Sequence, residues 1–118
     1  MNSLGQNLIQ ESSMETQDYL NKADRAIAAT VVEVNEELRQ HLIDSNYPPK
    51  AANSVQVFHD GDDLDFRFEG AGADTAQTIE YGNEKTPPQG SIRKFFNDTS
   101  RIEEIYMKNL EKSLGDLV

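Results

Sequence analysis

The chain has 118 residues and a formal net charge of −10, from 21 acidic and 11 basic side chains. That length suits one domain with one modest core. The charge argues against an isolated duplex, an RNA or an anionic membrane as the partner, because binding to phosphates needs clustered cations. The chain has no cysteine, which excludes disulfides, thiolate catalysis and cysteine zinc sites.

The first 18 residues are polar, with a thin apolar line of Leu4, Leu8 and Ile9. This pattern predicts a weak helical lead-in that could become ordered only in an assembly. The segment has no basic start and no long apolar run, so we expect no signal peptide. No stretch of the chain approaches the roughly 20 apolar residues that cross a bilayer.

Residues 19–42 carry the strongest periodic pattern. Apolar side chains recur there every three or four positions, which predicts an α-helix with one buried side. The helix should end before Pro48 and Pro49, because proline cannot continue the hydrogen-bond ladder, and a short polar connector over residues 50–54 should follow. The apolar positions are Leu20, Ala23, Ile27, Val31, Val34, Leu38 and Leu42.

Two strands are predicted next, because apolar and polar residues alternate with a period of two. An Asp60-Gly61 pair between them suits a tight reversal. Phe58 breaks the alternation and indicates either a bulge or a second contact surface. The alternating apolar residues are Val55 and Val57 in the first strand, and Leu64, Phe66 and Phe68 in the second.

Residues 69–77 are rich in Gly and Ala and read as a flexible loop. Residues 78–81 alternate again, with Ile79 and Tyr81 on one face, so we predict a third strand that ends at Gly82. Residues 83–90 hold Pro87 and Pro88 and should form an ordered irregular loop.

A second helical pattern begins near Ser91 and continues to the end of the chain. Its first turns, around residues 92–96, could form a separate short turn, because residues 97–100 are helix-capping types. The order α-β-β-β-α predicts an α+β fold, with a long N-terminal helix and a C-terminal helix packed on a three-stranded antiparallel sheet. Residues 1–118 should form a single domain, with residues 1–18 as an extension. The apolar positions of the second helical pattern, which should form one buried stripe of the C-terminal helix, are Ile102, Ile105, Tyr106, Leu110, Leu114 and Leu117.

No stretch carries a recognisable catalytic motif, so the sequence predicts no enzyme, no catalytic residue and no cofactor. Four aspartates at the hairpin turn raise the possibility of a calcium site. An EF-hand requires Gly at position six and Glu at position twelve of its loop, where this chain has Asp65 and Ala71, so a solvated turn is favoured. His41 and His59 have no partner at metal-ligand spacing. A small enzyme with an unrecognised acidic site stays open as a third interpretation.

Residues 79–96 combine aromatic rings, prolines and cations, and arginine and aromatic side chains are common anchors of protein interfaces. We therefore predict a protein-interaction surface in this segment, with plain core packing as the alternative. Its candidate residues are Tyr81, Gly82, Pro87, Pro88, Ile92, Arg93, Phe95 and Phe96.

The chain resembles the tailed-bacteriophage neck or tail-completion proteins, also known as minor tail or head-tail joining proteins, in its layout over nearly its whole length and in a more specific motif over about residues 79–96. The shared layout is a long helix, a proline break, a hairpin, a strand ending on an aromatic-Gly pair, a proline loop and a C-terminal helix. The matching pieces here are Tyr47-Pro48-Pro49, Glu80-Tyr81-Gly82, Pro87-Pro88 and Ile92-Arg93-Lys94-Phe95.

The resemblance implies a non-enzymatic virion protein, assembled in the host cytoplasm, that forms a ring in the neck. Its partners would be copies of itself, the head-closure or connector protein, and the tail terminator or tube protein, with DNA passing through as non-specific cargo and no membrane. An acidic lumen would not grip phosphates, so we expect the hairpin acids or the acidic side of the long helix to face the channel. The alternative is a cytosolic adaptor that binds one protein. The candidate channel residues are Asp60, Asp62, Asp63 and Asp65.

Overall fold

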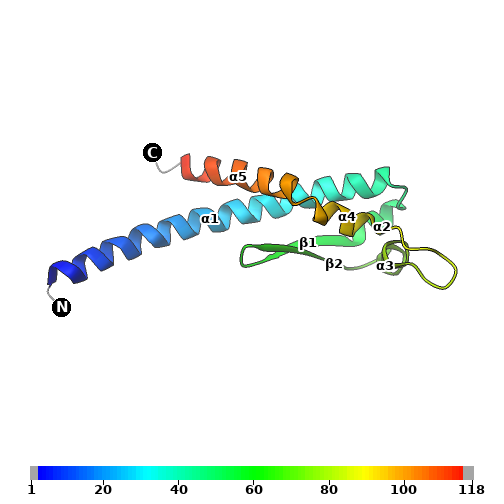
Figure 1. Ribbon diagram of the computed structural model, residues 1–118, viewed down its shortest axis with the longest axis horizontal. Coiled ribbons are helices and arrows are strands. Elements are labelled where there is room, and N and C mark those ends of the chain that lie inside the picture. Colours follow the sequence, from blue (N-terminus) through cyan, green and yellow to red (C-terminus); the bar gives the residue numbers. More distant parts are fainter. Residues whose placement is uncertain (1–2, 116–118) are drawn as a thin grey trace.

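The computed structural model describes the backbone of residues 3–115 and the side chains of residues 17–115 (Figure 1). The molecule measures 71 × 28 × 24 Å, because one helix runs along most of its length and the other elements gather around the C-terminal part of that helix. None of the described helices is long and apolar enough to cross a membrane. The elements are α1 (Ser3–Asp44), α2 (Pro49–Ser54), β1 (Val55–Asp60), β2 (Asp63–Phe68), α3 (Ala73–Tyr81), α4 (Ser91–Asn97) and α5 (Thr99–Gly115).

The predicted N-terminal helix is confirmed as α1, and the predicted lead-in is helical from Ser3. Of the predicted apolar positions, Ile27, Val34, Leu38 and Leu42 are buried and Val31 is partly buried, whereas Leu20 is 48% exposed. Helix α5 confirms the C-terminal helix and runs antiparallel beside α1 (Figure 1), where it buries Ile105 and Leu110. Leu117, the last position of the predicted stripe, lies outside the described residues.

Polar contacts fix α5 against α1. Inside the seam, the Asn109 amide donates to the Thr30 hydroxyl at 3.2 Å, and both side chains are buried. At the rim, Lys108 Nζ lies 3.0 Å from Glu33 Oε2, and the hydrogen bond from Lys108 lowers the pKa of Glu33. Arg101 forms a second ion pair with Glu37 on α1. The rim pairs are half-exposed and contribute little free energy, so the buried seam provides most of the attachment.

The predicted hairpin is confirmed, with β1 and β2 antiparallel in a continuous register from Val55–Phe68 to Asp60–Asp63. A bulge at Phe58 is therefore wrong: Phe58 pairs directly with Asp65, and its ring lies under the Arg67 guanidinium at 5.3 Å. Val55 and Val57 point into the core.

The predicted third strand is wrong, because residues 78–81 belong to helix α3 and the sheet has two strands among the described residues. The predicted flexible loop over residues 69–77 is also wrong in its second half, where α3 begins at Ala73. Gly72, with φ of 89°, turns the chain into the helix. The buried side chains of α3 are Ala76 and Glu80, four positions apart, which is the spacing of one helix face.

The predicted polar connector over residues 50–54 is helix α2, with Pro49 at its first position. Proline suits this position because its missing N–H has no partner there and its φ is already helical. Helix α1 ends before the prolines as predicted: Asn46 has φ of 71°, and the Tyr47 N–H returns to the Leu42 carbonyl at 2.9 Å. Helices α4 and α5 are separate, as the capping residues indicated.

A side-chain hydrogen bond connects the hairpin to α1: Asn35 Oδ1 accepts the backbone N–H of Val57 at 2.7 Å. We predict that Asn35→Ala lowers the free energy of unfolding by about 1–2 kcal/mol, because it leaves a partly buried N–H without a partner. Urea unfolding followed by circular dichroism measures this change. Gln40→Ala, which removes an exposed amide from the same helix, is the matched control. Equal midpoints for the two variants would contradict the prediction.

Candidate protein-interaction surface

A fully buried carboxylate, Glu80, holds the segment of residues 79–96 together. Its Oε1 accepts the backbone N–H of Ile92 at 2.6 Å and the Tyr47 hydroxyl at 3.3 Å. Its Oε2 accepts Nε of Arg93 at 2.6 Å and the Arg93 backbone N–H at 3.3 Å. A buried charge is costly unless it is paired and hydrogen-bonded, and here both oxygens are. Glu80 therefore links α3 to the first turn of α4 and to the end of α1.

Arg93 completes this link from the outside. Its Nη2 donates to the Glu80 carbonyl oxygen at 2.7 Å, and its guanidinium lies 4.8 Å above the centre of the Tyr81 ring. Burial, and then the nearby Glu80 charge, raise the pKa of Tyr47, so its hydroxyl keeps its proton and donates. The result is one connected polar group that includes a cation and an aromatic ring at the surface.

The loop of residues 83–90, between α3 and α4, is held by its own hydrogen bonds. Asn83 Oδ1 accepts the backbone N–H groups of Lys85 at 2.9 Å and Thr86 at 2.8 Å. The Gln89 N–H returns to the Ile79 carbonyl at 2.9 Å. The loop is therefore ordered, as the sequence predicted, and it projects at one end of the molecule (yellow in Figure 1).

Gly82 sets the path into this loop. It has φ of 76°, and a Cβ there would lie 2.7 Å from the Pro88 nitrogen and 2.7 Å from the Thr86 oxygen. Only glycine fits such a close approach of backbone to backbone. The proline pair is thus pressed against the end of α3, with Pro87 and Pro88 exposed.

An aromatic row runs inward from the loop. Tyr81 contacts Phe68 at a ring separation of 6.3 Å, Phe66 contacts Phe96 at 5.3 Å, and Phe95 contacts Phe96 at 5.8 Å. Tyr81 is 49% exposed, whereas the phenylalanines are half-buried. The row therefore connects a surface ring to the core.

The structure brings most of the predicted interface residues together but gives them different roles. Tyr81, Pro87, Pro88 and Arg93 are exposed, and Gly82 shapes the loop. Phe95 and Phe96 lie partly under the surface. Ile92 is fully buried, so its side chain belongs to the core and is not available to a partner. The exposed part is hereafter called the shoulder, defined as Tyr81, Arg93 and residues 83–90.

The hairpin acids form a separate feature. Asp60, Asp62, Asp63 and Asp65 are all exposed at the turn, and Asp65 accepts the backbone N–H of Phe66 at 2.8 Å. Within residues 17–115, no three His, Asp or Glu side chains are grouped so as to hold a metal ion.

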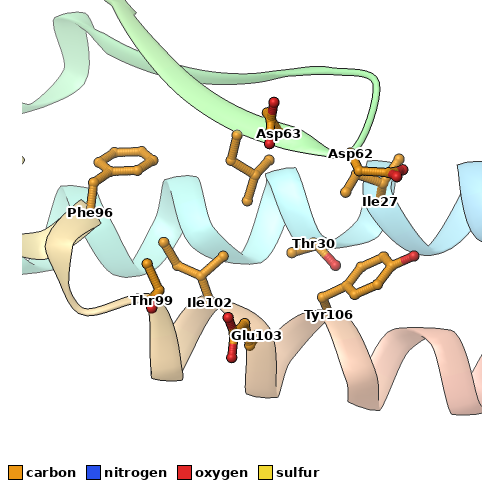
Figure 2. Close-up of a pocket in the computed structure, with 10 residues that line it drawn as sticks. Ile27, Thr30, Asp62, Asp63, Phe96, Thr99, Ile102, Glu103 and Tyr106 are labelled. Carbon is orange, nitrogen blue, oxygen red and sulfur yellow. The ribbon is translucent and has the colours of Figure 1, made fainter.

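A groove of about 290 Å³ lies between the hairpin turn, α1 and α5 (Figure 2). Five of the ten residues that line it are apolar or aromatic, two are threonines and three carry carboxylates. Burial, and then the Asp62 charge, raise the pKa of Tyr106 in this groove. The apolar and aromatic lining comprises Ile27, Leu64, Phe96, Ile102 and Tyr106, and the acids are Asp62, Asp63 and Glu103.

Sequence reasoning missed both Glu80 and the groove. The spacing of Glu80, four positions after Ala76, is that of one helical face and could have indicated burial. Hydrophobic periodicity does not count a carboxylate as a buried position, so Glu80 was not identified. The groove gave no signal, because its lining comes from four separate segments of the chain. No protein-family model, curated protein or solved structure matches this chain.

We predict that Glu80→Ala lowers the free energy of unfolding by about 3 kcal/mol, because it leaves the buried N–H of Ile92 and the partly buried donors of Arg93 without an acceptor. Glu80→Gln should cost less, since the amide oxygen can still accept one of them. Chemical denaturation measures both changes. Glu104→Ala, which removes a carboxylate that is 72% exposed on α5 and forms only a surface ion pair with Arg101, should change the midpoint little. A Glu80→Ala protein as stable as this control would show that the buried network is dispensable.

A pair of glycine variants tests the loop's close packing. Gly61 and Gly82 both have positive φ, but a Cβ at Gly61 meets open space. We expect Gly61→Ala to lower the free energy of unfolding by about 1 kcal/mol, through backbone strain alone. Gly82→Ala should cost at least about twice as much, because the loop must also move away. Thermal and urea unfolding of both variants gives the comparison, and equal losses would mean that the loop is loosely held.

Proposed function

We propose that this chain is a non-catalytic structural protein of a tailed-phage neck, a ring subunit that joins the head connector to the tail tube. One observation carries the proposal: residues 79–96, whose sequence resembles neck proteins although residues 79–81 are helical, present the exposed shoulder, and hydrogen bonds to the buried Glu80 tie it to the fold. Fixed surfaces suit assembly, because little conformational entropy is lost on contact.

The shape of α1 supports the same proposal. Its N-terminal part runs beyond every other element (Figure 1). An isolated helix of that length is marginal in water, since most helical stability in proteins comes from packing. A ring would supply neighbouring subunits against which this part of α1 packs.

The acids support a position beside passing DNA. Eight acidic and two basic residues lie within residues 51–90, and the hairpin aspartates are exposed. We propose that the acidic turn or the acidic side of α1 faces the channel, where like charge prevents the wall from gripping phosphates. The partners are then the connector and tube proteins together with further copies of this chain.

A joining assay tests the function. Phage lacking this protein should accumulate DNA-filled heads and free tails, and addition of the purified chain should convert them into infectious particles. Tyr81→Ala, which trims the exposed ring of the shoulder, should reduce the yield of joined particles while circular dichroism shows that the variant is still folded. Met107→Ala is the matched control, because it trims an apolar side chain that is 50% exposed on α5, away from the shoulder.

Two results would contradict the proposal. Normal joining in the absence of the chain would remove the neck role altogether. A purified chain that binds one cytosolic protein as a 1:1 complex, and never heads or tails, would instead support the adaptor. If Tyr81→Ala and Met107→Ala were equally active, the shoulder would not be the contact surface.

A further inference from the structure

We propose that the loop of residues 83–90 in one copy docks into the groove between the hairpin turn, α1 and α5 of the next copy. This inference rests on the proposed function, because it identifies the contact that would build the ring. The proposed contact would pair the exposed loop with the groove, two surfaces that lie on different parts of the chain.

The groove has the chemistry of a site for proline-rich segments. Two aromatic side chains line it, Phe96 at one end and Tyr106 at the other, and Figure 2 shows the Tyr106 ring reaching from α5 toward α1 below Asp62. Proline-rich segments dock in aromatic-lined grooves, because the stiff ring stacks on aromatic faces at low entropic cost. The carboxylates of Asp63 and Glu103 stand at the edge, where they favour a cation beside the apolar contact.

The loop has the complementary chemistry. Lys85, Pro87 and Pro88 are all exposed, so a cation and two apolar rings are presented together; the exposed Glu84 beside Lys85 leaves the loop neutral as a whole. The Asn83 side chain already holds the Lys85 and Thr86 backbone, which lowers the ordering cost of binding. The occupant that fits the groove is therefore present on the chain itself.

Loop and groove are different surfaces, so the contact is heterologous: each copy offers its loop to one neighbour and its groove to the other. Such contacts generate rings when the rotation between copies closes. A symmetric pairing of two grooves would instead bring the carboxylates of Asp62, Asp63 and Glu103 against one another, which like-charge repulsion disfavours. Asp60 and Asp65 are not part of the groove and stay available to a channel.

A mixing experiment tests this contact on the full chain. The loop variant carries Lys85→Ala and Pro87→Ala, and the groove variant carries Asp63→Lys and Glu103→Lys. Native mass spectrometry and light scattering should show multimers of the wild-type chain, with association weakened about tenfold or more in each variant alone. An equimolar mixture of the two variants should form a 1:1 dimer, in which the intact loop of the groove variant docks into the intact groove of the loop variant. The dimer should not grow further, because the loop and the groove that remain free are both altered.

Matched controls separate this contact from general charge effects. Lys50→Ala repeats the loss of an exposed lysine, and Glu36→Lys with Glu111→Lys repeats the charge change of the groove variant at exposed sites elsewhere. Both controls should assemble like the wild-type chain, and circular dichroism should show all variants folded. A monomeric wild-type chain, unaffected assembly of either variant, or failure of the mixture to pair would each overturn the inference. The joining assay is independent of this result, so a neck protein that assembles through another surface would still join heads to tails.

Discussion

The structure depends on one buried charge. Helices α3 and α4 have nine and seven residues, and helices this short do not persist in water without tertiary support. Glu80 supplies that support by accepting N–H groups at the start of α4 while its own helix packs on α2. Because the carboxylate also holds Tyr47, the same group connects this pair of helices to the end of α1.

The main secondary-structure elements could be predicted because their patterns are long or simple. The helical stripe of α1 extends over more than six turns, and the hairpin shows clear alternation around an Asp-Gly pair. The prediction of a third strand failed because the alternation of apolar and polar residues around Ile79 and Tyr81 covers too few positions to distinguish a strand from a helix. The competing helical face contains Glu80, and a method that follows hydrophobic periodicity does not count a carboxylate as buried.

The candidate surface could be predicted in composition but not in arrangement. Aromatic, proline and arginine residues close in sequence identified residues 79–96, and the structure groups Tyr81 with Arg93 as a stacked pair. Which of these side chains are exposed depends on packing against α1 and β2, so Ile92 could not be assigned from sequence. The groove depends still more on tertiary structure, because the hairpin turn and α5 come from distant parts of the chain.

The buried pair of Thr30 and Asn109 has a consequence for dimensions. A purely apolar seam could slide by one helical turn, about 5.4 Å, at modest cost, whereas sliding here would leave two buried polar groups without partners. The pair therefore locks the axial offset between the two long helices. That offset determines how far the N-terminal part of α1 extends beyond α5, so the buried hydrogen bond, together with the two ion pairs at the rim, sets the length of helix that projects from the rest of the molecule.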